Sequence, residues 1–282
     1  MTDPDPRESV SDDPDPERRT PAYGRADRAV SEVLSFILVF SLITASVGVV
    51  SVVGLGSLQD ARDAERIDNA ERAFEVLAAN QRDIVYGGAP SRSTEIKLAE
   101  TSLTLAAPTD VNLTGDGGAT LGIAESRPIT FGMAGDGPGL TSGVVYEMGA
   151  VLRVDRGGAV IQRPPPFQFG ADRTVIHYVA LQSSTGSVQR RAGSTTVLVR
   201  SSRGSTSLLA HKPDDGETYT LTITTDPQRS GAWKRYLEAQ LDGMSPSPGS
   251  PCDPLDGSGT VTCTFQTDDL RLTRTTIRVG LS

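Results

Sequence analysis

The side chains that most often carry chemistry are sparse in this 282-residue sequence, which holds two histidines and two cysteines. His177 lies in an alternating apolar run, TVIHYVAL, a pattern that predicts a strand in which the histidine is structural. His211 precedes Lys212 and Pro213 in a predicted loop, and only folding could bring a serine and a carboxylate to it. The spacings Gly-x-Ser-x-Gly, Walker A, His-Glu-x-x-His and zinc ribbon do not occur. We therefore assign no catalytic residue and expect a protein that is not an enzyme.

Two further patterns bear on ligands. The pairs Asp214-Asp215 and Asp253/Asp256 offer carboxylates for Ca²⁺ but lack the regularly spaced oxygen ligands of a calcium loop. The glycines at 135–139 resemble a phosphate loop only in glycine content, because no strand, helix or lysine accompanies them. The sequence thus predicts a turn there, and no metal or cofactor anywhere.

Cys252 and Cys263 bracket a stretch rich in turn residues, CDPLDGSGTVTC. In an exported domain they would close a small disulfide loop that staples a hairpin, the alternative being a reduced pair. Two ligands without a nearby histidine are too few for structural zinc. Asn112-Leu113-Thr114 is an N-glycosylation sequon, available if this part of the chain is exported.

The charge balance restricts the partners. The chain has 27 Lys and Arg against 35 Asp and Glu, a formal net charge of −8, so no general basic field exists to bind nucleic acid. Lysine occurs only at three positions, and Asp outnumbers Glu. An Arg-over-Lys, Asp-rich surface suits concentrated salt and thus a halophilic archaeon, although it also suits a GC-rich genome.

One apolar segment determines the location. Residues 33–59 form a run of 27 residues without a charge. A helix of ~20 residues crosses a bilayer core of ~30 Å, so this run predicts a single membrane span. The alternatives are a buried core helix, which the length disfavours, and a cleaved secretory signal, whose apolar region is normally shorter.

The residues before this run predict its orientation. The Asp-Pro repeats and acids of residues 1–29 cannot support a packed core, so we expect a disordered acidic leader. By the positive-inside rule the basic flanks favour, narrowly, a cytoplasmic N-terminus and an extracellular head. The flanking arginines are Arg18, Arg19, Arg25 and Arg28 before the run, and Arg62 and Arg66, interleaved with acids, after it.

The junction RADRAVSE, residues 25–32, resembles the class III signal of archaeal type IV pilins and archaellins. The resemblance implies that a prepilin peptidase cuts between Ala29 and Val30, with Arg28 as the preceding basic residue. Glu32 would become the third mature residue, where a neighbouring subunit's α-ammonium could pair with it in a filament. Bacterial pilins carry their glutamate two positions later, and the alternative is a carboxylate at the headgroup level.

Three segments are similar to a haloarchaeal family of pilin-signal surface proteins: NAERAFEVLA, GGAPSRSTEIK (residues 87–97) and GAWKRYLEAQL. This resemblance, which extends over most of the chain, implies a location and an architecture but no activity.

The helix is expected to continue beyond the bilayer. Residues 60–88 carry one apolar stripe, and Gly87, Gly88 and Pro90 supply a stop. The stripe consists of Ile67, Ala70, Phe74, Leu77, Ala78, Ile84 and Val85.

The remainder reads as a β-rich head. Eight or nine short alternating strands predict an antiparallel sandwich or barrel. The candidates are residues 94–106, 127–133, 143–154, 174–181, 195–203, 218–225, 260–266 and 270–279. One interruption, QRSGAWKRYLEAQL, has the spacing of a helix packed on the sheet.

The expected fold class is α+β: a long N-terminal transmembrane and stalk helix followed by an antiparallel β-sandwich-like head. The domains are a cytoplasmic leader (1–29), a transmembrane helix (30–59), a helical stalk (60–88) and an extracytoplasmic head (89–282). The expected function is a non-enzymatic pilin-like surface protein, a pilus subunit or minor pilin. Its partners are the lipid bilayer, a prepilin peptidase and other pilin subunits. The alternatives are an anchored binding or sensor domain outside filaments, and an anchored hydrolase.

Overall fold

The computed structural model describes residues 26–134, 139–213, 216–244 and 249–282, without the side chains at 26–29, 60, 123 and 134. Most of the expected leader, residues 1–25, therefore lies outside the described residues. The chain divides into two compact units, Met1–Asp60 and Ala61–Ser282.

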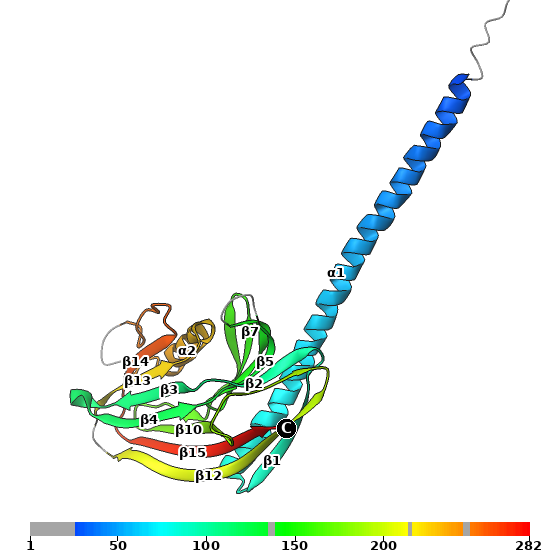
Figure 1. Ribbon diagram of the computed structural model, residues 1–282. Coiled ribbons are helices and arrows are strands. Elements are labelled where there is room, and N and C mark those ends of the chain that lie inside the picture. The colour runs from blue at the N-terminus through cyan, green and yellow to red at the C-terminus, as the bar shows by residue number, and fades with distance from the viewer. Residues whose placement is uncertain (1–25, 135–138, 214–215, 245–248) are drawn as a thin grey trace, which may run out of the picture. The chain divides into compact units, whose positions relative to one another are not determined.

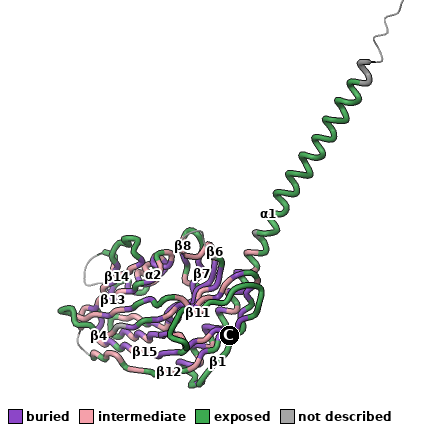
Figure 2. The backbone as a smooth tube through the Cα atoms, viewed as in Figure 1, coloured by how far each residue is buried: buried purple, intermediate pink, exposed green. Residues whose placement is uncertain are grey.

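The first unit contains the apolar part of helix α1 (Ala26–Tyr86). Residues 30–59 are exposed apart from Gly56, which is half-buried (Figure 2). Their most apolar 18-residue window has a mean hydropathy of 2.5, and none of it is buried. By length and composition this helix could cross a membrane.

The second unit begins with the rest of α1, whose predicted apolar stripe is confirmed. All seven stripe residues are buried, and Gln81 is a polar side chain on the same face, with 1% of its surface exposed. The helix ends as expected at the two glycines. Gly88 has a positive φ of 76°, and the Ala89 N–H donates back to the Asp83 carbonyl at 3.3 Å.

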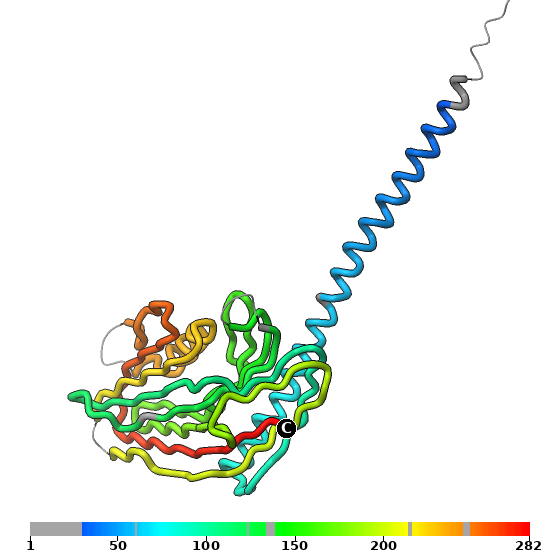
Figure 3. The backbone as a smooth tube through the Cα atoms, in the orientation of Figure 1, coloured from blue at the N-terminus to red at the C-terminus, as the bar shows by residue number. Residues whose placement is uncertain are grey.

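A five-stranded sheet contains both the first and the last strand of the head (Figure 1). The last strand, drawn red in Figure 3, lies between two strands of earlier sequence, one antiparallel to it and one parallel. The order is β1 (Ser91–Lys97), β12 (Thr196–Lys212), β15 (Leu270–Leu281), β10 (Thr174–Ser183) and β9 (Phe167–Gln168).

Two further sheets are antiparallel throughout. The six-stranded one has the order β11 (Gln189–Gly193), β2 (Thr101–Leu105), β5 (Ile129–Ala134), β6 (Leu140–Glu147), β7 (Ala150–Asp155) and β8 (Gly158–Arg163). The four-stranded one has the order β14 (Thr260–Gln266), β13 (Thr218–Thr224), β3 (Thr109–Thr114) and β4 (Thr120–Ser126), with a 3₁₀ turn at Asp116–Gly118.

Helix α2 (Pro227–Gln240) is the helix expected in QRSGAWKRYLEAQL. The Asp226 side chain caps it by accepting the Gln228 N–H at 2.9 Å, and Pro227 occupies its first position. Trp233 and Leu237 are fully buried on its inner face.

The head has two hydrophobic cores, and β10 contributes to both. Ile176 and Tyr178 belong to a core beneath α2 and the four-stranded sheet. Val179 and Leu181 belong to a second core, which the apolar stripe of α1 closes. Because successive side chains of a strand point to opposite faces, one strand can serve two cores.

The expected fold class, a helix followed by a β-rich head, is confirmed, but several strand expectations were wrong. Residues 94–106 form two strands, β1 and β2, and residues 143–154 form the hairpin β6–β7. The described residues contain fifteen strands instead of eight or nine, and the β10–β15 pair is parallel. The β6–β7 hairpin turns at Met148 and Gly149, with φ of 52° and 91°, the signature of a type I′ turn.

Candidate functional site

The expected processing junction lies in the first turns of α1. Arg28 and Ala29 fall within the helix Ala26–Tyr86, although their side chains are outside the described set. Val30 is 58% exposed, and Glu32 is also exposed and forms no ion pair with any described residue. The junction therefore opens the helix directly, and Glu32 follows within one turn.

Two serine side chains of the apolar segment are hydrogen-bonded to the backbone of the helix itself. The Ser46 hydroxyl donates to the Leu42 carbonyl at 2.8 Å, and the Ser57 hydroxyl donates to the Val53 carbonyl at 2.9 Å. A hydroxyl satisfied in this way needs no water, which is the condition for placing serine in hydrocarbon. Local hydrogen bonding thus makes Ser46 and Ser57 compatible with a bilayer.

The structure brings together one pair of the expected site residues: Cys252 and Cys263 form a disulfide, with an S–S distance of 2.03 Å. Cys263 lies on β14, and Cys252 pairs with it as an isolated antiparallel bridge. The backbone continues this pairing, since the Asp253 N–H donates to the Thr262 carbonyl at 2.9 Å. The disulfide therefore fastens the loop after α2 to the edge of the four-stranded sheet.

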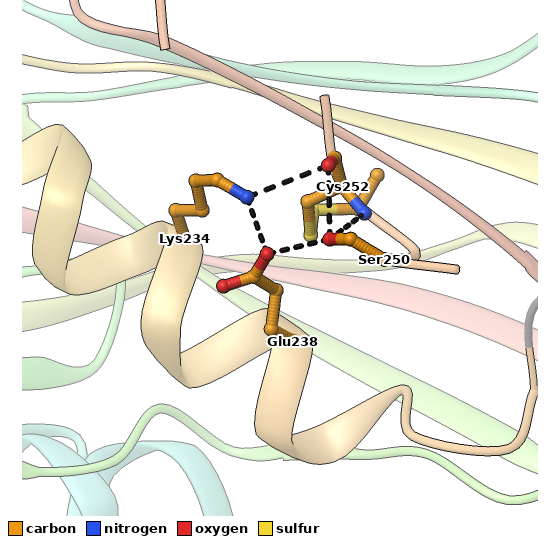
Figure 4. The surroundings of a disulfide bond; sticks show 5 residues. Lys234, Glu238, Ser250 and Cys252 are labelled. Carbon is orange, nitrogen blue, oxygen red and sulfur yellow. Dashed lines mark hydrogen bonds and ion pairs between the residues drawn. A yellow bond between two sulfur atoms is a disulfide. The ribbon is translucent and has the colours of Figure 1, made fainter. Parts of the chain in front are cut away.

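Side chains of α2 hold the same loop (Figure 4). Lys234 pairs with Glu238 one turn later, and its ammonium donates to the Cys252 carbonyl at 3.4 Å. The Ser250 hydroxyl donates to Glu238 Oε1 at 2.6 Å and accepts the Cys252 N–H at 3.2 Å. The hydrogen bonds from Lys234 and Ser250 lower the pKa of Glu238. These contacts are structural, because every group in them is occupied by the protein.

The sequon residue Asn112 lies inside β3, opposite Thr222 of β13. It is half-buried, and its Oδ1 is buried with no hydrogen-bond partner among the described residues. From the sequence, this sequon is available to glycosylation only if the head is exported. The structure places it on a strand that is paired on both sides.

The histidines lie apart from each other. His177 Nε2 lies 2.9 Å from the Thr275 hydroxyl, and burial lowers the pKa of this histidine. His211 Nε2 lies 3.6 Å from Asp269 Oδ1, while Asp269 Oδ2 accepts from Arg173 at 2.8 Å. In the described part of the chain no hydroxyl is hydrogen-bonded to His211, so no triad forms.

The next question is whether the carboxylate pairs could bind Ca²⁺. Asp214 and Asp215 fall outside the described residues, as do residues 135–138 of the glycine run. Within the described ranges no group of three or more His, Cys, Asp or Glu side chains is placed to hold a metal ion.

Sequence reasoning missed a buried polar cluster between β6 and α2. Glu147 has no exposed surface, and both of its carboxylate oxygens are occupied. Oε1 accepts from Thr225 at 2.8 Å and from Arg229 at 3.2 Å, and Oε2 accepts from Arg229 at 3.2 Å and from Trp233 at 2.9 Å. Each partner is 78 or more residues away along the chain, so no local pattern could reveal the cluster.

Sequence reasoning also missed a cavity of about 510 Å³ within the second unit. Its walls come from the last turns of α1, the strands β9 and β10, and three consecutive prolines. The lining contains His177, Tyr86, Tyr146, Arg82, Arg163 and Pro164–Pro166. The rings of Tyr86 and His177 meet edge to face with centroids 5.0 Å apart.

Comparison with known proteins adds one finding. A family model described as a family of unknown function (DUF7289) matches residues 28–280. The chain belongs to this family. The DUF7289 match begins at Arg28 and covers both the apolar helix and the head, so the two are parts of one family unit. No curated protein and no solved structure matches the chain.

Proposed function

We propose that this chain is a non-enzymatic, membrane-anchored, pilin-like cell-surface protein, a pilus subunit or minor pilin. In this proposal a prepilin peptidase removes residues 1–29, Val30 becomes the N-terminus, and the head is exported. The resemblance of residues 25–32 to an archaeal class III signal suggests this processing. The observation that carries the proposal is the continuity of α1: the junction, the exposed apolar segment and the packed stripe lie on one helix.

The physical argument begins with the exposed segment. Residues 30–59 present large apolar side chains around the whole helix, including Phe36, Leu42 and Val52, which are 66–75% exposed. An exposed apolar helix of this length is stable only in lipid or against similar helices. The hydroxyls of Ser46 and Ser57 are hydrogen-bonded to carbonyls of the same helix. Lipid and a filament core of like helices both meet this requirement.

Glu32 offers a specific contact for filament assembly, an ion pair with a neighbouring subunit. A carboxylate at the edge of an apolar helix is costly unless it is paired. Glu32 forms no ion pair with the described residues, so a charged group of another subunit could neutralise it. The α-ammonium created at Val30 of a neighbouring subunit is such a group.

The start of the DUF7289 match supports the same division of the chain. The matched region begins at Arg28, one residue before the proposed last residue of the leader. Nearly all of the acidic leader thus lies outside the family unit, while the helix and the head lie inside it. This is what we expect if the leader has no role after processing.

The experiment is N-terminal sequencing of the protein extracted from membranes, with Arg28→Glu as the test variant and Arg25→Glu as its control. We expect wild type and R25E to begin at Val30, and R28E to keep its leader. A wild-type chain that begins near Met1 would overturn the proposal.

The alternative is a single-span anchored binding or sensor domain that does not enter filaments. The cavity beside His177 favours it, because a subunit that only assembles has no need for a pocket. Cell fractionation separates the two functions: a filament subunit appears in sheared surface fractions, whereas an anchored sensor remains in membranes.

A further inference from the structure

The cavity beside His177 lies wholly within the second unit and has the size of a small-molecule site. Its volume of about 510 Å³ is within the range of ligand pockets, ~300–1,000 Å³. The protein builds it from α1, from β10 and from the segment before β9. Each of these elements is held by a core or a sheet.

One wall is rigid because it consists of Pro164, Pro165 and Pro166. The ring of proline fixes φ, so this wall keeps its shape without a ligand. Backbone hydrogen bonds hold it: the His177 N–H donates to the Pro166 carbonyl at 3.2 Å. Gly149 permits the close approach, since a Cβ there would lie 2.6 Å from Pro166 Cδ.

The charged side chains that line the cavity are arginines. Arg82 and Arg163 line the cavity, and the lining includes no aspartate or glutamate. Arg163 gives one amino group to Glu75 at 3.0 Å, while Arg82 forms no ion pair with the described residues. In a chain of net charge −8 this set of lining residues favours an anionic ligand.

A neutral hydrogen-bond donor accompanies these guanidinium groups. Tyr146 is almost fully buried and lines the cavity, and desolvation raises the pKa of its hydroxyl, so the hydroxyl keeps its proton at neutral pH. No hydrogen bond occupies this hydroxyl among the described residues. Gln81, also in the lining, has a buried Oε1 without a described partner. Unused polar groups of this kind favour a ligand that has hydrogen-bonding groups of its own.

Flat surfaces complete the lining. Tyr86 is 55% exposed, His177 is half-buried, and Phe167, which follows the prolines, is buried. Aromatic rings and prolines pack well against a flat ring face. A guanidinium group can bind a carboxylate in its own plane, through parallel N–H donors.

We propose that this cavity binds a small cyclic carboxylate, with the carboxylate at Arg82 and Arg163 and the ring between Tyr86 and the proline wall. The shared chemistry is a carboxylate on a six-membered ring. Its source is either a sugar acid, free or at the end of a surface glycan, or an aromatic acid. The direct polar contacts are the Arg82 and Arg163 guanidinium groups and the hydroxyl of Tyr146.

The test is isothermal titration of the full chain in detergent with four probes: glucuronate, benzoate, glucose and sulfate. We expect at least one carboxylate to bind about tenfold more tightly than glucose and sulfate, since charge-assisted hydrogen bonds are the strong ones. Binding of glucuronate identifies a sugar acid, and binding of benzoate alone identifies an aromatic acid. If neither carboxylate binds more tightly than glucose, or if sulfate binds equally well, the proposal is wrong.

Matched variants locate the binding. Arg82→Gln should weaken carboxylate binding about tenfold, whereas Arg72→Gln, another exposed arginine of α1 outside this cavity, should leave it unchanged. Tyr86→Ala tests the ring contact independently and should also weaken binding. Equal losses in R82Q and R72Q would overturn the proposed site. The measured affinities should not depend on whether the leader is removed, because the cavity lies outside it. The test is therefore independent of the processing proposal.

Discussion

Glu147 on β6 and Arg229 on α2 form an ion pair inside the head, with 3.2 Å between Glu147 Oε2 and Arg229 Nε. Glu147 is fully buried, and the Arg229 side chain is 8% exposed. Burying two charges costs desolvation energy, and here Thr225 and Trp233 supply the additional hydrogen bonds that offset it. The pair thus fixes where α2 lies on the six-stranded sheet.

Removing one charge of this pair should be strongly destabilising. We expect Glu147→Gln to lower the free energy of unfolding by about 3–5 kcal/mol, because Arg229 is left as a buried charge without its counter-ion. Glu75→Gln is the control, since the Glu75 side chain is 51% exposed to solvent, and it should cost at most about 1 kcal/mol. Chemical denaturation followed by the fluorescence of Trp233, the one tryptophan, measures both. Equal losses in the two variants would contradict the structural role of the pair.

The disulfide should contribute to stability in the same assay. Its sulfurs join residues 11 apart, and a closed loop of this size is worth about 2–3 kcal/mol through the entropy of the unfolded chain. The double variant Cys252→Ser, Cys263→Ser should lose this amount, and reductant should destabilise the wild type but leave the double variant unaffected. A wild type that is insensitive to reductant would argue against the bond.

His177 should make stability depend on pH. Burial lowers its pKa below the ordinary 6.5, so below that pH the unfolded chain binds the proton more readily than the folded one. The free energy of unfolding should therefore fall as pH decreases from 6.5 toward the lowered pKa. The groups around the ring are Tyr86, Thr275 and the cavity arginines.

Two variants isolate this contribution of His177. His177→Gln should flatten the slope of the unfolding free energy between pH 7 and pH 5. His211→Gln is the matched control and should keep the wild-type slope, because the His211 side chain is 39% exposed. Identical slopes in wild type and H177Q would refute the assignment.

Glu32 should matter for assembly and not for insertion. We expect Glu32→Gln to reach the membrane and to be processed like wild type, but to be reduced about tenfold in sheared surface fractions, because the charged hydrogen bond to the neighbouring α-ammonium is lost. Glu65→Gln, an exposed glutamate further along α1, is the matched control. Surface fractions unchanged in E32Q would exclude this role of the carboxylate.

The sequence predicted best where a pattern is local. The stripe from Ile67 to Val85 and the helix around Trp233 follow from helical spacing, and the structure contains both. The end of α1 follows from Gly87 and Gly88, for the same local reason.

Turns without the usual turn residues could not be found in this way. The break between β1 and β2 lies at Ala99 and Glu100, which adopt positive φ of 47° and 68° although neither is glycine or asparagine. The Glu100 carboxylate pairs with Arg66 of α1 at 2.6 Å, a tertiary contact that supports this turn. A run that alternates cleanly across such a turn reads as one strand.

Contacts between segments far apart in the chain also could not be predicted from the sequence. The parallel pairing of β10 with β15 joins residues such as His177 and Thr273, 96 positions apart. The cavity likewise combines Gln81, the proline wall and His177 from three separate segments. No spacing in the chain records such a juxtaposition.

The N-terminus of the membrane-extracted protein tests the central claim most directly. Intact-mass measurement and N-terminal sequencing of the wild-type chain should give a protein that begins at Val30 and has lost residues 1–29. The Arg28→Glu variant should retain its leader in the same preparation. A wild-type protein that still begins near Met1 would contradict the pilin-like account.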